Sequence, residues 1–412
     1  GVVLPVCLPK TAWPPTFPTG GWQTLSHNPD AVPVEVPGTV EEYLTVTDNP
    51  RPENFRGVSW WYRKITIPAD QQKKRFIIYF ESVRMRAEVY LDGKLVAYDL
   101  IGETPFHVDI TDEAKPGKEQ LLAIRVTNPG GNFHWQDFDI MKWGEYNIPP
   151  SRSFTGIIGR VKLESVNPVF ISDIYMQNTP ELTKVNAILS FTNETSSSVK
   201  QDVELIVNEK GNPDKVVFRQ TLKAISFPAG NHEVTIPVNV PDAKLWDLST
   251  PELYTCNVLI KKGKKTLDQD KKDFGFRWFT VDGVGKDAVL RLNGRRIMLR
   301  SAISWGYFPV TGLIATTEMA EKQVRTAKSL GLNMLNFHRC IGSPVVLEKA
   351  DELGLLYYEE PGSFHSANHD PFIRTIVNEK LKRMVYRDRS HPSLVIFNLI
   401  NEFGGPLSQG KG

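Results

Sequence analysis

The chain has 412 residues, too many for one ordinary hydrophobic core, and this length predicts two or three domains. Its 49 Lys and Arg nearly balance its 47 Asp and Glu, so the charge favours neither a nucleic acid nor an anionic membrane as partner and suits a neutral ligand best. The longest apolar runs, such as Leu394 to Phe397, are far shorter than the roughly 18 to 20 residues that cross a bilayer, which predicts a soluble chain.

The cysteines and the first residues bear on the cellular location. Cys7, Cys256 and Cys340 are widely spaced, so they predict neither a disulfide framework nor a zinc knuckle, and we expect them to be small core residues. The chain begins Gly1-Val2-Val3 without an initiator Met or a charged leader, so we expect any signal peptide to have been removed or not included. The location stays open, with the periplasm or the exterior as the favoured expectation and the cytoplasm as the alternative.

The first region, residues 1–167, reads as all-β. Short apolar segments alternate with turn residues from Ser59 onward, and Asp92-Gly93 between two of them is a strong hairpin signal. No helical period intervenes. We expect an antiparallel β-sandwich or jelly roll, preceded by an extended Pro-rich arm.

A second all-β region is expected at residues 168–282. It is about a hundred residues long, and its turn spacing suits an immunoglobulin-like β-sandwich. Its predicted strands include Val185 to Phe191, Asp202 to Val207, Glu233 to Val238 and Thr255 to Ile260. It brings together no side chains that suggest chemistry, so we interpret it as a spacer.

The period changes after Asn293-Gly294, and residues 283–412 alternate strands with amphipathic helices. Glycine ends the first two predicted helices, as expected for a C-terminal stop. Repeated strand and helix units predict parallel pairing, and by analogy the two preceding β-sandwiches favour the first half of a (β/α)8 TIM barrel over a doubly wound sheet. The predicted elements are strands Ile297 to Ile303, Met334 to Phe337, Leu355 to Tyr358 and Leu394 to Ile400, and helices Glu318 to Leu330, Val345 to Leu353 and Ile373 to Arg389.

Functional side chains of a parallel barrel stand at the C-terminal ends of its strands. Here that rule selects Ser304-Trp305, the segment Asn336 to Arg339, Glu359-Glu360 and Asn401-Glu402. A carboxyl partly withdrawn from water has a raised pKa and can donate a proton to a leaving oxygen, which singles out Glu402. On position alone, a plain loop carboxylate is an equally good interpretation.

Motifs along nearly the whole chain resemble glycoside hydrolase family 2, the β-galactosidase, β-glucuronidase and β-mannosidase family. The last motif is the most specific, and the order and spacing of the set are stronger than any one member. The motifs are GVSWWYRK at 57–64, FESV at 80–83, AEVYLDG at 87–93, TPFHVDI at 104–110, GIIGRV at 156–161, FGFR at 274–277, LNG at 292–294, and RDRSHPS at 387–393 followed by Asn401-Glu402.

The resemblance implies a retaining exo-β-glycosidase, most like a β-galactosidase, whose first domain is a jelly-roll sugar-binding domain. It makes Glu402 the general acid/base and Asn401 the partner of the sugar 2-hydroxyl. The nucleophile of the family lies on a later barrel strand, so we expect this chain to lack it and to be inactive alone. We expect Glu359 and Glu360 to be structural or to line the pocket.

The rule on strand ends makes further residues candidates for substrate binding, namely Trp305, Asn336, His338, Arg339 and Glu360. The family usually has Arg where this chain has Asn336, and Arg339 is the candidate to supply that positive charge. His391 precedes its strand, so we expect it to pack and hydrogen bond. The pocket floor is expected to differ from that of well-known β-galactosidases.

The partners and cofactors follow from the same interpretation. We expect a carbohydrate substrate, neither nucleic acid nor membrane, and leave a homo-oligomer open. No metal or cofactor is assigned, although a divalent cation bound by Glu360 and His365 is a weaker alternative. The rival class is a non-catalytic carbohydrate-binding or scaffold protein that has kept the domains of the family.

Overall fold

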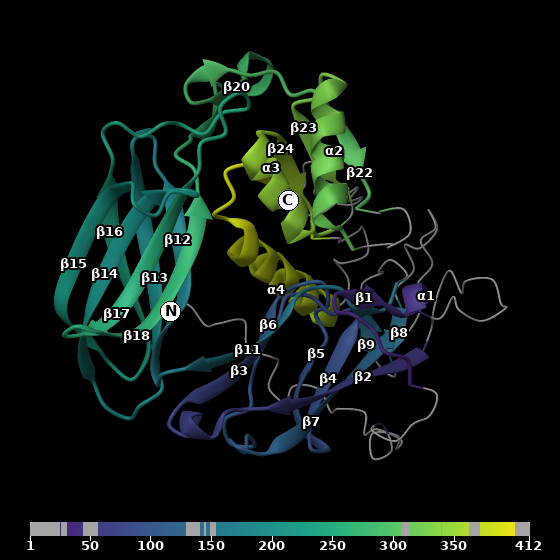
Figure 1. Ribbon diagram of the computed structural model, residues 1–412. Helices are drawn as coiled ribbons and strands as arrows, with labels where there is room; N and C mark the ends of the chain where they lie inside the picture. Colours follow the sequence, from purple (N-terminus) through teal and green to yellow (C-terminus); the bar gives the residue numbers. More distant parts are fainter. Residues whose placement is uncertain are drawn as a thin grey trace.

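A computed structural model describes residues 25, 31–43, 57–128, 141–143, 146–148, 154–306, 308, 314–338, 340–361 and 371–399. Two antiparallel β regions flank a smaller unit of parallel strands and helices (Figure 1). In the described part of the chain, no helix is both long and apolar enough to cross a membrane.

The first β region packs a four-stranded sheet, β2-β7-β4-β5, against a three-stranded sheet, β11-β3-β6. Alternate residues point inward, so Ala87, Val89 and Leu91 of β4 join the core with Phe80 and Phe106, whose rings stack 4.8 Å apart. The predicted hairpin at Asp92-Gly93 is confirmed, because both residues have the positive φ that its tight turn requires. The strands are β2 Gly57–Thr66, β3 Arg75–Phe80, β4 Arg86–Leu91, β5 Lys94–Asp99, β6 Phe106–Asp109, β7 Glu119–Asn128 and β11 Val161–Val166.

Short elements complete this region. β1 pairs with β10, and β8 pairs with β9. Their bounds are β1 Gly38–Thr39, α1 Val40–Tyr43, η3 Ala69–Gln71, β8 Met141–Trp143, β9 Tyr146–Ile148 and β10 Gly156–Ile157.

The second β region is an immunoglobulin-like sandwich of sheets β12-β13-β16 and β15-β14-β17-β18. Its inner faces share one apolar core that includes Leu189, Val203, Leu205 and Cys256, all of them fully buried. The four strands predicted from the sequence lie within β13, β14, β16 and β17. The strands are β12 Val169–Asn178, β13 Lys184–Asn193, β14 Val199–Glu209, β15 Val216–Phe227, β16 Gly230–Asn239, β17 Tyr254–Lys262 and β18 Lys265–Phe274.

A small three-stranded sheet leads from this sandwich into the parallel unit. It consists of β19 Phe279–Asp282, β20 Val289–Leu292 and β21 Arg295–Arg296, with η4 Gly285–Asp287 between the first two. The expected strand from Ile297 starts later than predicted, at Ser301. The reason is that the Ile297 amide donates to the Leu290 carbonyl, which extends this hairpin instead.

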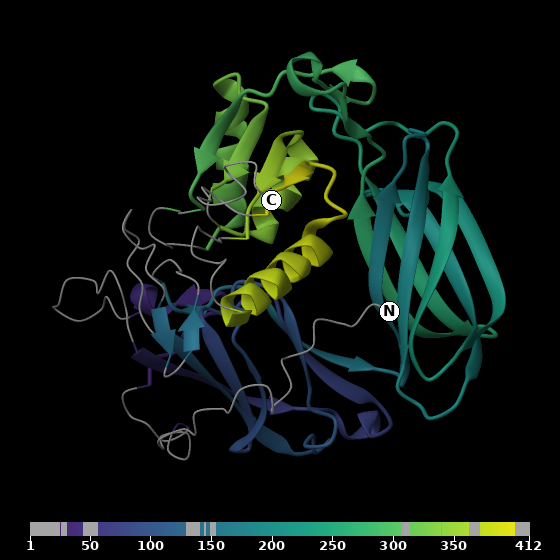
Figure 2. The ribbon, with the colours of Figure 1, turned by 180° about the vertical axis from the view of Figure 1, so that it is seen from behind.

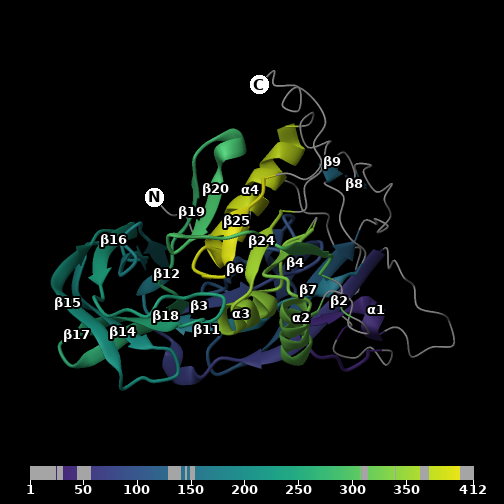
Figure 3. The same cartoon turned by 90° about the horizontal axis from the view of Figure 1, so that it is seen from above.

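The parallel sheet has the order β22-β23-β24-β25, with α2 and α3 side by side on one face (Figure 3). Thr316 caps the first helix by accepting from the Met319 amide, and Gly354 ends the second with a positive φ. Both glycine-terminated helices were predicted. The elements are β22 Ser301–Ser304, α2 Thr317–Ser329, β23 Met334–Phe337, α3 Pro344–Leu353, β24 Leu356–Glu359, α4 Pro371–Asp388 and β25 Leu394–Phe397.

Helix α4 lies between the parallel unit and the first β region (Figures 1 and 2). Its sequence predicts one apolar face, and Ile376 and Met384 of that face are buried. The same helix also buries two cations that the pattern did not predict. Arg383 Nη1 donates to Asp99 Oδ1 at 2.7 Å, with both side chains at most 2% exposed, and Lys380 pairs with Glu103.

Replacing Arg383 with Met should destabilise the chain by about 3 kcal/mol, because Asp99 would stay buried without its counter-charge. Arg325→Met is the matched control, since Arg325 forms an exposed pair with Glu321 one turn away on α2 and should matter little. Urea unfolding of both variants measures the difference. Equal losses would show that the buried pair does not hold α4, whereas a double variant with Asp99→Asn should recover part of the loss.

Candidate functional site

The C-terminal edge of the parallel sheet gathers polar and aromatic side chains on one face. Side chains alternate along each strand, and the strand register aligns Ile303, Asn336, Tyr358 and Ile396 across the sheet. The residues two positions after these four, in the same order, are Trp305, His338, Glu360 and Asn398. The alternation therefore assigns these four residues to the same face, at the end of the strands.

Contacts between the side chains agree with this assignment. The rings of Trp305 and His338 meet edge to face with centroids 4.5 Å apart, and His338 Nδ1 lies 3.6 Å from Glu360 Oε1. Glu360 is only 1% exposed. The structure thus brings together Trp305, His338 and Glu360, three of the residues that the sequence singled out.

Tyr358 and Asn398 belong to this group and were missed by the sequence analysis. Tyr358 pairs with Ile396 in the sheet, and its side chain lies near those of Glu360 and Asn398. Burial and the neighbouring Glu360 carboxylate raise the pKa of Tyr358 to about 12. Tyr358 therefore stays a neutral hydrogen-bond donor at physiological pH. The alternation of side chains upstream of Glu360 was the signal that could have found it.

Asn336 lies one layer below His338 on the same face. It is half-buried, and its Oδ1 has no hydrogen-bond partner within the described part of the chain. Such an acceptor is costly to leave unpaired. Asn336 can therefore accept a hydrogen bond from a polar ligand group.

Glu359 points to the opposite side of the sheet from Glu360. It is fully buried, and its Oε1 accepts from the Gly342 amide at 2.7 Å and from Arg387 Nη2 at 3.4 Å. Burial and the nearby Asp388 carboxylate raise the pKa of Glu359 well above its usual range. Glu359 fastens the loop between β23 and α3, which agrees with the expected structural role.

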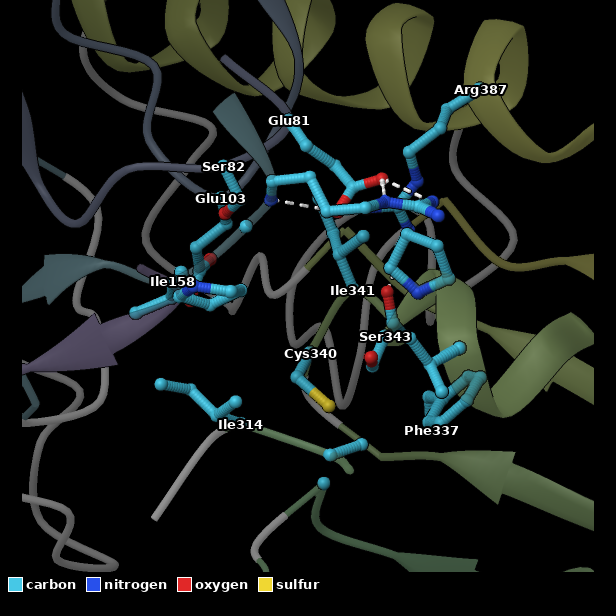
Figure 4. Close-up of a pocket in the computed structure, with 18 of the residues that line it drawn as sticks. Glu81, Ser82, Glu103, Ile158, Ile314, Phe337, Cys340, Ile341, Ser343 and Arg387 are labelled. Atoms are coloured by element: carbon cyan, nitrogen blue, oxygen red, sulfur yellow. Dashed lines mark hydrogen bonds and ion pairs between the residues drawn. The ribbon is translucent and has the colours of Figure 1, made fainter. Parts of the chain in front are cut away.

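A cavity of about 80 Å³ lies between the first β region and the loops that follow β22 and β23 (Figure 4). Glu81 and Arg160, joined by an ion pair of 2.6 Å, line one side of the cavity, and Arg387 lies on the same side near Glu81. Cys340 also borders it, and its Sγ contacts the Trp305 carbonyl oxygen at 3.7 Å. Of the predicted substrate-binding residues that the structure describes, none lines this cavity.

Three predicted site residues, Arg339, Asn401 and Glu402, lie outside the described residues, and so does His365. Within the described ranges, no group of three or more His, Cys, Asp and Glu side chains could hold a metal ion. The roles assigned to these residues, and the cation between Glu360 and His365, stay predictions.

The segment 387–393, which leads into β25, is held by hydrogen bonds to other parts of the chain. His391 Nδ1 lies 2.5 Å from Asp351 Oδ2, and the Ser393 amide donates to Asp351 Oδ1 at 3.0 Å. Arg277 donates to the carbonyl oxygens of Pro392 and Leu394, at 3.0 and 2.9 Å. His391 thus packs and hydrogen bonds, as its position before the strand predicts.

Comparison with known proteins agrees with this architecture. The model of the glycosyl hydrolases family 2 sugar-binding domain matches residues 29–147, and the glycosyl hydrolases family 2 model matches residues 169–277. The chain belongs to glycoside hydrolase family 2. The resemblance drawn from the sequence motifs is therefore confirmed.

Two curated relatives carry different activities in their names. A β-glucuronidase of Formosa agariphila is 24% identical and aligns with 94% of this chain and 40% of its own length. A β-galactosidase of Thermoanaerobacterium thermosulfurigenes is 28% identical over 82% of this chain and 46% of its own length. The chain thus spans less than half the length of these family 2 relatives.

Solved structures of the family share the fold. A family 2 member from Bacteroides cellulosilyticus superposes with a TM-score of 0.77 at 23% identity, covering 92% of this chain and 50% of that one. A β-glucuronidase from Bacteroides uniformis gives 0.73 at 22% identity, covering 90% and 44%. At this identity the likeness concerns the fold.

The pair His391–Asp351 makes stability depend on pH. Burial alone would lower the pKa of His391, but the Asp351 carboxylate outweighs burial and raises it. A group whose pKa is raised on folding stabilises the folded state fully at pH values below its unfolded-state pKa, which is about 6.5 for His. This stabilisation is lost as the pH rises through the folded-state pKa. The free energy of unfolding should therefore fall as the pH rises above the unfolded-state pKa of about 6.5 and through the raised folded-state pKa of His391.

Replacing Asp351 with Asn should flatten this slope as well as lower the overall stability. Asp287→Asn, at an exposed carboxylate of η4, is the control and should keep the slope of the parent chain. Chemical unfolding at several pH values measures both. An unchanged slope in Asp351→Asn would refute the assignment.

Proposed function

We propose that the whole protein containing this chain is a retaining exo-β-glycosidase that hydrolyses a terminal β-linked sugar. Family membership supports the reaction class, and the position of β25 supports the site. The chain leaves β25 at the edge where Trp305, His338 and Glu360 gather, and Asn401-Glu402 follows within five residues of Phe397. This convergence is the observation that carries the proposal.

In this proposal Glu402 first protonates the leaving glycosidic oxygen and then, as a base, activates the water that releases the sugar. The second carboxylate, which attacks the anomeric carbon, must stand roughly 5 to 5.5 Å away for retention of configuration. We assign it to a later strand of a completed (β/α)8 barrel, of which β22 to β25 would be the first half. Asn401 holds the sugar 2-hydroxyl.

The described face suits recognition of a sugar. Trp305 offers an aromatic surface for the apolar side of a pyranose ring, while Glu360 and the Asn336 Oδ1 accept from hydroxyl groups. His338 stands between Trp305 and Glu360 and can donate. We assign substrate binding to these four residues and to Arg339.

The sugar is a β-galactoside or a β-glucuronide. The sequence motifs favour a β-galactosidase, whereas the curated relatives include proteins named for both activities. A panel of nitrophenyl β-glycosides, with galactoside, glucuronide and mannoside members, identifies the substrate when tested on the full-length protein. We expect the 412-residue chain alone to be inactive on the same panel.

The Glu402→Gln variant of the full-length protein should lose hydrolysis of poorly activated glycosides by at least about 100-fold, because the leaving oxygen is no longer protonated. Azide should partly restore turnover of activated nitrophenyl substrates, since these need no acid and azide needs no base. Glu321→Gln, on the exposed side of α2, is the matched control and should keep full activity. Unchanged activity in Glu402→Gln would remove the assignment.

A carbohydrate-binding protein without catalysis is the second candidate. It is favoured by the exposed Ile303 of β22 and the unpaired edges of a four-stranded parallel sheet, which the described part of this chain leaves uncovered. Sugar binding by the full-length protein without turnover of any member of the panel would support it.

A further inference from the structure

We propose that a basic surface where the two β regions meet binds an anionic polysaccharide. This surface, the basic seam, consists of residues 261–265 at the turn between β17 and β18 and of Lys73 and Lys74, which precede β3. The second β region, interpreted from the sequence as a spacer, thereby gains a binding role. Such binding needs no hydrolysis, so it does not depend on the proposed glycosidase activity.

The turn between β17 and β18 concentrates positive charge at the end of a hairpin. Four of the five residues 261–265 are lysines, and Gly263 makes the turn with a φ of 61°. Lys261 Nζ pairs with Glu204 Oε2 at 2.8 Å. The other lysines, which are exposed and form no ion pair with any described residue, are Lys262, Lys264 and Lys265.

A second basic stretch lies on the first β region and is joined to this turn. Lys73 is exposed, and Lys74 Nζ donates to Asn167 Oδ1 at 2.8 Å. Asn167 lies between the two β regions, and its Nδ2 donates to the carbonyl oxygen of Leu267, two residues after Lys265. Hydrogen bonds through one side chain therefore hold the two basic stretches together as one surface.

Carboxylates beside the basic seam already have partners. Asp109 forms an ion pair with Arg75, the residue after Lys74. Asp268 Oδ2 accepts from the Ile171 amide at 2.8 Å, which turns it toward β12. Within the described residues, the exposed lysines of the turn and Lys73 thus lack a counter-charge. Since the formal net charge of the whole chain is only +2, this is a local concentration of positive charge.

The composition of the basic seam favours a polysaccharide over a membrane or a nucleic acid. Residues 262–266 are Lys, Gly and Thr, so the turn offers neither an apolar side chain to enter a bilayer nor an aromatic ring to stack on a base. Lysine ammonium groups act as point charges that suit sulfate or carboxylate groups in many orientations. Cations spread over two β regions fit a long polymer, and a carbohydrate polymer suits a member of a glycoside hydrolase family.

The test measures binding of the full-length protein to dextran sulfate, a sulfated polysaccharide, and to neutral dextran. The seam variant combines Lys262→Gln, Lys264→Gln and Lys265→Gln. Its Kd for dextran sulfate should rise at least about 10-fold at low salt, and its binding should depend less steeply on salt, because fewer counterions are released. Binding of neutral dextran as tight as that of dextran sulfate would overturn the proposal, and so would an unchanged Kd in the seam variant.

A charge-matched control separates the position of the lysines from their number. Lys286→Gln, Lys322→Gln and Lys382→Gln together remove the same charge from exposed positions on η4, α2 and α4. This control should bind dextran sulfate like the parent protein. Equal weakening in both variants would show that net charge alone matters and would overturn the basic seam. Urea unfolding should be the same for all three proteins, because every substituted side chain is exposed.

Further measurements test the extent of the surface and the class of its partner. Lys73→Gln alone should raise the Kd for dextran sulfate about 3-fold, and an unchanged value would show that the surface does not extend to the first β region. Vesicles of phosphatidylcholine with phosphatidylglycerol and a thymidine oligonucleotide serve as the other anionic probes. Tighter binding of either probe than of dextran sulfate would overturn the assignment to a polysaccharide.

Discussion

The position of α4 against the first β region depends on buried charges. Arg383 and Lys380 are taken out of water against Asp99 and Glu103, and Glu103 also accepts from Arg84 Nη1 at 2.6 Å. Removing one partner of such an ion pair would leave the charge of the other partner buried without compensation. A purely apolar contact would let α4 shift along the surface of the first β region. Paired charges permit one position of the helix, and α4 runs directly into the segment that starts β25.

The segment 387–393 connects α4 to β25, so the position of α4 also determines where β25 starts. Arg387 donates to the Gly342 carbonyl oxygen at 2.6 Å and contacts Glu359, His391 pairs with Asp351 of α3, and Arg277 of the immunoglobulin-like region holds the backbone at Pro392. The start of β25 is thus fixed by the parallel unit and by the region before it. A strand anchored at its start has its end in a defined place, where the Asn398 backbone amide donates to the Glu359 carbonyl oxygen at 2.8 Å.

The sequence predicted what local chemistry decides. Gly331 and Gly354 end their helices, and Asp92-Gly93 makes its hairpin, because these residues adopt positive φ within a few residues of chain. Helical periodicity could not reveal that Lys380 and Arg383 are buried, since their partners are about 280 residues earlier in the sequence. Trp305, His338 and Glu360 were found because strand ends are recognisable. Tyr358 was missed because an aromatic residue inside an apolar strand is typical of a core.

The dipeptide Glu359-Glu360 shows why residue type alone does not define a site. The two side chains are identical and adjacent, yet the alternation of the strand sends them to opposite faces. Glu359 enters a fully buried position beside Asp388, where burial and like charge favour its protonated form, and it fastens a loop. Glu360 instead lies beside Tyr358 and His338, with His338 Nδ1 3.6 Å from Glu360 Oε1, on the same face as Trp305. Exchanging their environments would require a shift of one residue in register, which would turn every side chain of β24 to the wrong face. The register of this short strand therefore decides which of the two carboxylates lies on the face to which we assign sugar binding.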